Sequence, residues 1–123
     1  MLSERLQTVS SKHDLKFSDQ VSRVVRRLLA LRRCSMDQVS AEFRMNERRI
    51  NRLLEREGTT YQRILQEALR TLAERLLMDT DMPLGKISVV LNYADASVFT
   101  RAFRNWHGRS PSEWRSAHAR RGK

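Results

Sequence analysis

Apolar residues recur every three or four positions along most of the chain, which is the spacing of helices with one buried face. The pattern divides into seven segments, and the longest covers residues 59–78. The chain has only four glycines and two prolines, which leaves little room for the turns that many short strands would need. The pattern therefore predicts an all-α fold of about seven helices without a strand.

Residues that commonly cap helices stand at the borders of these segments. The expected N-terminal caps are Ser18 or Asp19, Ser35, Asn46, Thr59 or Thr60, and Asp95. The sequence SPSE at 110–113 has the form of a capping box with Pro111 in the first turn. Gly58 and Gly108 are expected to end two helices, and Asn92 stands at a corner where asparagine tolerates a left-handed backbone.

Charge adds a functional expectation to this helical pattern. The net charge is +10, and 20 of the 24 basic residues are arginine. An excess of this size in a small domain indicates a polyanionic partner, nucleic acid before an anionic membrane. Arginine presents a planar fork that matches phosphate and guanine edges, although the codon usage of a GC-rich genome produces the same bias.

The residue types of catalytic or metal sites are not clustered in the sequence. His13, His107 and His118 lack the spacing of metal ligands, and neither paired carboxylates nor a glycine-rich phosphate loop is present. Cys34 is the only cysteine and is expected to be buried as a small apolar residue. No apolar run has the length of a membrane span. We therefore expect a cytoplasmic protein that is not an enzyme and that needs no metal and no cofactor.

Two stretches of the chain resemble each other. Residues 39–58 and residues 87–108 each contain a short helical pattern, a turn, and a longer helical pattern ended by glycine. This is the pattern of a helix-turn-helix motif, present twice. When the apolar residues Ile50 and Phe99 are set inward, rotation by about 100° per residue places Arg52 and Arg101 on the opposite, outer faces.

The second stretch resembles the conserved pattern of AraC/XylS-type transcription regulators. Asn92 stands where that pattern has glycine, Ser88 where it has alanine and Tyr93 where it has phenylalanine, and all three are mild departures. The resemblance covers about residues 18–118. The positions that match the pattern are Ile87, Leu91, Asp95, Ser97, Phe99, Arg101, Phe103, Arg104, Gly108, Pro111, Trp114 and Arg115.

The resemblance implies that two helix-turn-helix lobes, joined by a long helix, bind successive major-groove segments of double-stranded DNA. It also implies which positions read bases, and arginine and asparagine suit guanine and adenine edges. The implied base-reading residues are Arg48, Asn51, Arg52, Ala96, Ser97, Thr100 and Arg101. We expect contacts to phosphate from residues beside these faces. The expected phosphate-binding residues are Arg49, Arg56, Thr60, Lys86, Arg104 and Arg115.

The expected organisation has four parts. A flexible tail or cut linker covers residues 1–17, the first lobe 18–58, the linker helix 59–78, and the second lobe with a basic tail 79–123. Members of the family commonly carry a further domain on the N-terminal side, so we expect this chain to be a fragment, with a free-standing small regulator as the alternative. We also expect RNA polymerase as a partner, dimerisation through the missing N-terminal domain, and no membrane contact.

Two other interpretations stay open at this point. The basic helical faces could belong to a protein-interaction module that binds an acidic partner. Alternatively, the chain could be the DNA-binding domain of a recombinase or transposase that lacks its catalytic part. Selective binding to duplex DNA would separate the first alternative from a transcription regulator.

Overall fold

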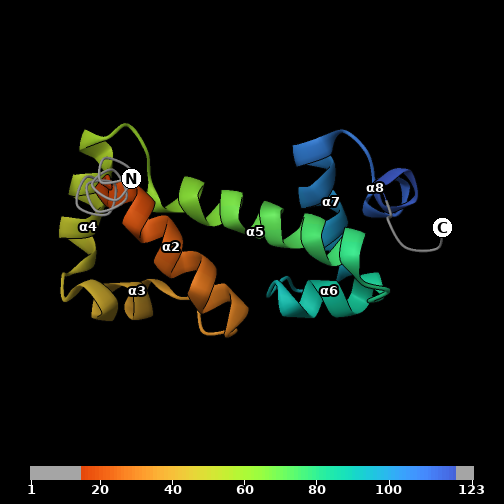
Figure 1. The fold of residues 1–123 in the computed structure, drawn as a ribbon, viewed down its shortest axis with the longest axis horizontal. Coiled ribbons are helices and arrows are strands. Elements are labelled where there is room, and N and C mark those ends of the chain that lie inside the picture. The colour runs from red at the N-terminus through yellow and green to blue at the C-terminus, as the bar shows by residue number, and fades with distance from the viewer. Residues whose placement is uncertain (1–14, 119–123) are drawn as a thin grey trace, which may run out of the picture. The chain divides into compact units, whose positions relative to one another are not determined.

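The computed structural model describes residues 15–118, and this part of the chain contains seven helices and no strand (Figure 1). The helices are α2 (Phe17–Ala30), α3 (Met36–Phe43), α4 (Glu47–Arg56), α5 (Tyr61–Asp79), α6 (Leu84–Val90), α7 (Ala96–His107) and α8 (Pro111–His118). The all-α prediction is therefore confirmed. The tails expected before residue 15 and after residue 118 lie outside the described residues. None of the described helices is long and apolar enough to cross a membrane.

The chain divides into two compact units, Met1–Leu65 and Gln66–Lys123, and the border falls within α5. In the first unit, α2, α3 and α4 pack against one another, and the start of α5 adds Ile64 to their core. The ring of Phe17 meets the ring of Phe43 edge-on at 5.1 Å between centroids. The buried apolar side chains of this unit are Val21, Val25, Leu28, Leu29, Val39, Ile50, Leu54 and Ile64.

The start of α2 differs from the expectation that Ser18 or Asp19 caps it. The helix begins at Phe17, and its N-cap Lys16 makes no side-chain capping bond. Instead, the backbone N–H groups of Phe17 and Ser18 donate to the two carboxylate oxygens of Glu57, at 3.1 and 3.0 Å. The hydrogen bonds from Ser18, with a smaller effect of Phe17, lower the pKa of the exposed Glu57 carboxyl. The residue that ends α4 therefore also caps α2.

The second unit is built around aromatic residues. Phe99 and Phe103 on α7 and Trp114 on α8 are buried, and the rings of Phe103 and Trp114 meet edge-on at 5.7 Å. Trp106 on α7 is only half-buried. The remainder of α5 contributes one stripe to this core, namely Ala68, Leu69, Ala73 and Leu77. The Ser110–Glu113 capping box forms as predicted, with reciprocal bonds of 3.0 and 3.2 Å.

Candidate nucleic-acid interface

The turn between α3 and α4 has a defined backbone geometry. Arg44 adopts a left-handed conformation with φ 54°, the N–H of Met45 donates to the Ser40 carbonyl at 3.2 Å, and the N–H of Arg44 lies 3.3 Å from the Ala41 carbonyl. Asn46 then caps α4, because its side chain accepts from the backbone N–H of Arg49 at 2.8 Å. A cap and a closed turn of this kind fix where α4 starts and which way its faces point.

The turn between α6 and α7 repeats this bonding pattern 48 residues later. Asn92 has φ 66°, the N–H of Tyr93 donates to the Ser88 carbonyl at 2.8 Å, and the N–H of Asn92 donates to the Val89 carbonyl at 3.0 Å. The left-handed corner predicted at Asn92 is therefore confirmed. Ser88 is buried where the AraC/XylS pattern has alanine, and its hydroxyl donates to the Leu84 carbonyl at 2.8 Å, so no polar group is left unsatisfied there.

The two helices that follow the turns are held in the same way. Asp95 caps α7 by accepting from the backbone N–H of Val98 at 3.0 Å, as Asn46 caps α4. The two caps lie 49 residues apart, whereas Arg44 and Asn92 lie 48 apart, so the second turn is one residue longer. Below the caps, Ile50 and Leu54 are buried on α4, and Phe99 and Phe103 are buried on α7, with the same interval. Each helix thus turns an equivalent face away from the core.

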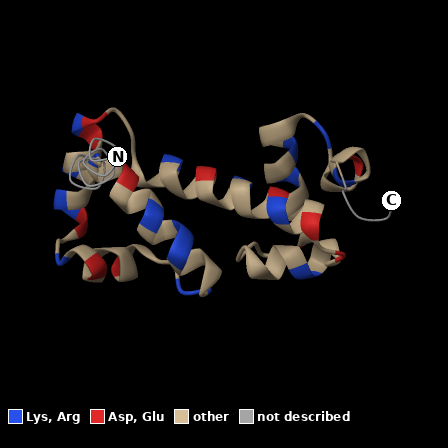
Figure 2. Cartoon of the chain, viewed as in Figure 1, with Lys and Arg blue, Asp and Glu red and all other residues tan. Residues whose placement is uncertain are grey.

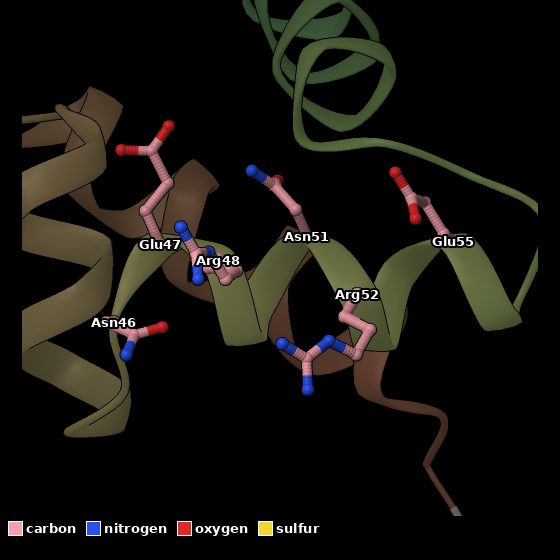
Figure 3. Close-up of a pocket in the computed structure, with 6 residues that line it drawn as sticks. All are labelled: Asn46, Glu47, Arg48, Asn51, Arg52 and Glu55. Carbon is pink, nitrogen blue, oxygen red and sulfur yellow. The ribbon is translucent and has the colours of Figure 1, made fainter.

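Helix α4 carries all three base-reading residues expected in the first unit. Arg48 and Arg52 are exposed, and Asn51 is half-buried. Figure 3 shows that the side chains of Glu47, Asn51 and Glu55 extend from one side of the helix, whereas Arg52 extends from the other. Figure 2 shows that the neighbouring α2 carries bands of basic residues, while α3 carries acidic ones.

The outer face of α7 is smaller and less polar. Ser97 and Arg101 are exposed, and Ala96 and Thr100 are half-buried. Arg101 lies 49 residues after Arg52, so it occupies the equivalent position in the second motif. Each unit therefore presents one arginine from the middle of the helix that follows its turn.

The residues expected to bind phosphate fall into two groups. Arg49, Arg56, Lys86 and Arg104 are exposed, as is Thr60, whose hydroxyl also caps α5 by accepting from Arg63 at 3.1 Å. These five residues stay available at the surface of their own units. Arg115 is placed differently.

The guanidinium of half-buried Arg115 binds backbone carbonyls. Its Nε donates to Leu77 at 3.0 Å, and its Nη2 donates to Met82 at 2.9 Å and Thr80 at 3.2 Å, with Leu76 at 3.5 Å. These carbonyls belong to the end of α5 and the segment that follows it, where a helix leaves backbone acceptors without partners. Arg115 therefore joins α8 to α5.

A second polar contact supports α7 from α5. The Nε2 of His107 lies 2.8 Å from a carboxylate oxygen of Glu74, and the same carboxylate pairs with Arg70. The His107 contact is close, but its direction does not suit a linear N–H hydrogen bond. The His107 ring also stacks on Phe103 at 4.4 Å. The sequence pattern did not indicate the contact between Glu74 and His107, because these residues lie on different helices.

Cys34 and Tyr61 lie together in the first unit, with Sγ and the phenol oxygen 3.7 Å apart. Burial raises the pKa of the Cys34 thiol and also raises the pKa of Tyr61. The thiol is therefore held in its protonated, unreactive form at neutral pH. Cys34 is only half-buried, so the burial predicted for it is partial.

A family model described as a helix-turn-helix domain matches residues 39–117, which include both turns and both capped helices. The chain belongs to the AraC/XylS-type helix-turn-helix family. The ornithine utilization regulator of Pseudomonas aeruginosa is 40% identical over 96 residues, which are 76% of this chain and 28% of that protein. The transcriptional activator NphR of Rhodococcus is 33% identical over 103 residues, 84% of this chain and 31% of that protein. The AraC/XylS-type chain thus spans less than a third of the length of these relatives.

Solved structures have the same fold as this AraC/XylS-type chain. The transcriptional regulator CdpR from Pseudomonas aeruginosa aligns with a TM-score of 0.75 at 26% identity, over 86% of this chain and 33% of that one. A DNA-binding transcriptional dual regulator from Escherichia coli K-12 aligns with a TM-score of 0.75 at 22% identity, over 84% of this chain and 92% of that one. At that lower identity, the second likeness shows the fold alone.

Proposed function

We propose that this chain is the DNA-binding part of a transcription regulator, and that its two helix-turn-helix motifs read one specific sequence of double-stranded DNA. The observation that carries the proposal is the equivalent, exposed placement of Arg52 and Arg101 on two helices with matching caps and buried faces. Arginine makes the commonest specific contact to guanine in the major groove. The matching family and the names of the relatives, a utilization regulator and a transcriptional activator, support regulation of transcription.

In this proposal the outer face of α4 reads one segment of the site, and the outer face of α7 reads another. Arg48, Asn51 and Arg52 contact bases from α4, and Ala96, Ser97, Thr100 and Arg101 contact bases from α7. Exposed residues beside these faces bind phosphate, and they are Arg49, Arg56, Thr60, Lys86 and Arg104. The net charge of +10 suits this division, because phosphate contacts supply most of the affinity while base contacts supply the selectivity.

We propose that α5 sets the spacing between the two contacts. A continuous helix over Tyr61–Asp79 is about 28 Å long at 1.5 Å per residue, close to the ~34 Å between successive major-groove segments on one face of a duplex. We propose that the two motifs occupy such successive segments. In the whole protein, dimerisation and contact with RNA polymerase are further parts of the proposal.

The experiment selects bound sequences from a pool of random duplexes and then measures affinities for the selected site and a scrambled one. The wild-type chain is expected to prefer the selected site, and both affinities are expected to fall steeply with salt. Equal affinities for the two duplexes would refute selective recognition and favour an interaction module.

Two arginine variants locate the readers. Arg52→Ala and Arg101→Ala are each expected to relax the preference at a different base pair and to cost about 1–3 kcal/mol at that position. The matched controls are Arg63→Ala and Arg75→Ala, which remove exposed arginines of α5 from the first and second units. If the Arg52 and Arg101 variants weaken binding to every sequence evenly, as the controls should, then both arginines hold phosphate and the assignment is wrong.

A further inference from the structure

The internal repeat aligns a further residue with the expected base readers. Glu47 is the first residue of α4, and Ala96 is the first residue of α7. Their caps, Asn46 and Asp95, accept equivalent N–H groups, so the two positions correspond within the repeat. Sequence comparison placed Ala96 among the base readers but left Glu47 out. In the structure, Glu47 and Ala96 occupy equivalent positions, so Glu47 is a candidate base reader as well.

Glu47 has the surroundings of a contact residue. It is exposed, and it forms neither a hydrogen bond nor an ion pair with any side chain in the described range 15–118. Its charge acts on the phenol of Tyr61, with which it lines a hollow at the surface of the first unit. Its side chain extends from the same side of α4 as Asn51, one turn later (Figure 3). Recognition helices contact base edges mainly through their N-terminal residues, and Glu47 is the most N-terminal residue of this helix.

A carboxylate at this place is selective because it can only accept hydrogen bonds. DNA phosphates repel the carboxylate. In the major groove, guanine and thymine present acceptors, so neither base can replace the hydrogen bonds that the carboxylate loses when water is displaced. Cytosine offers the N4 amino group as a donor. Adenine offers the N6 amino group, but its N7 acceptor lies beside that group and would oppose the second carboxylate oxygen.

We propose that Glu47 selects cytosine at one base pair of the segment that α4 reads. This inference rests on the proposed function, and it adds a negative element to a surface otherwise read by arginine and asparagine. It acts in two ways, because the carboxylate accepts from cytosine and is repelled by guanine or thymine at the same position. Discrimination built from repulsion as well as attraction is a common source of specificity.

Two variants of Glu47 test the proposal by selection from random duplexes followed by sequencing. Glu47→Gln is expected to change the preferred base at that position from cytosine to adenine, because glutamine pairs with the N6 and N7 of adenine. Glu47→Ala is expected to remove the preference for cytosine, which should be about 5- to 150-fold in the wild-type chain. Preferences at the positions read by Arg52 and Arg101 should stay unchanged.

Glu55→Gln is the matched control, because Glu55 extends from the same side of α4, is exposed, and carries the same charge near the other end of the helix. This control is expected to raise affinity for all duplexes slightly while leaving every base preference intact. If the two Glu47 variants do the same, the proposal is overturned, and Glu47 serves only to stabilise the first turn of α4. A wild-type chain that enriches no sequence would instead refute the proposed function, and the Glu47 assignment with it. Circular dichroism of each variant checks that the total helical content is unchanged.

Discussion

Replacing Arg115 by alanine should destabilise the second unit strongly without touching its apolar core. The guanidinium donates three hydrogen bonds of 2.9–3.2 Å to carbonyls of Leu77, Thr80 and Met82. A hydrogen bond from a charged group contributes about 1.5–3 kcal/mol. Arg115 is only half-buried, so water can replace part of each bond, and we take about 1 kcal/mol apiece. The expected loss is therefore about 3 kcal/mol in the free energy of unfolding.

That loss is large for this unit. Small domains have about 0.05–0.15 kcal/mol of stability per residue, so a unit spanning Gln66–Lys123 has only several kcal/mol in total. The assay is urea denaturation followed by tryptophan fluorescence. Trp106 and Trp114 are the only tryptophans of the chain, and both lie in this unit, so the signal reports on it alone.

The expected result is a large decrease in the urea midpoint for Arg115→Ala and an intermediate decrease for Arg115→Lys, whose ammonium can keep some of the bonds. Arg75→Ala, which removes an exposed arginine of the same unit, should change the midpoint little. A loss below about 1 kcal/mol for Arg115→Ala, similar to that of the control, would show that water satisfies the carbonyls equally well. If this variant stays folded and its salt dependence of DNA binding becomes shallower by about one phosphate contact, Arg115 binds phosphate as the sequence first suggested.

Two further predictions concern the first unit and α5. Glu57→Ala should lower stability by at most about 0.5–1 kcal/mol at neutral pH, measured by circular dichroism in urea, whereas Glu55→Ala should have little effect. The pKa of Glu57 is lowered in the folded state, so its contribution to stability is fully present above the ordinary carboxyl pKa and is lost as pH falls through the lowered pKa. A stability difference between the wild-type chain and Glu57→Ala that persists in strong acid would contradict the carboxylate cap as its cause. Inserting one alanine after Arg70 should rotate the following part of α5 by about 100°. Sequence-specific DNA binding should then be lost, while non-specific, salt-sensitive binding should remain. Footprints that still cover both DNA segments at unchanged spacing and affinity would refute the proposal that α5 fixes the spacing.

The helix borders could be predicted because most caps are local. Ser35 accepts from Gln38, Asn46 from Arg49, and Asp95 from Val98, and each pair spans three residues. Such contacts depend only on nearby sequence. The rotation of α4 and α7 was predictable for the same reason, since Ile50 and Phe99 mark the buried face of their own helices.

Contacts between helices could not be predicted in this way. Glu57 lies in a run of charged residues, and nothing near it indicates that it caps a helix beginning 40 residues earlier. Arg115 matches an arginine of the family pattern, but the pattern does not say whether its partner is phosphate or a carbonyl 38 residues away. Ala73 is fully buried in α5, but the sequence pattern does not indicate this because alanine is a weak apolar signal.

The bonds of Arg115 also affect the order in which the protein can fold during its synthesis. The ribosome releases a chain from its N-terminus, and domains generally fold as units in that order. In the first unit, the longest-range hydrogen bonds connect the start of α2 to Glu57, so this unit can close once α4 and the start of α5 have emerged. In the second unit, the Leu77 carbonyl at the end of α5 receives its hydrogen bond from Arg115 only after 38 more residues have been synthesised. The first motif can thus become native while the second is still an open chain with exposed aromatic residues, and this interval is when a nascent chain would be most exposed to aggregation or proteolysis.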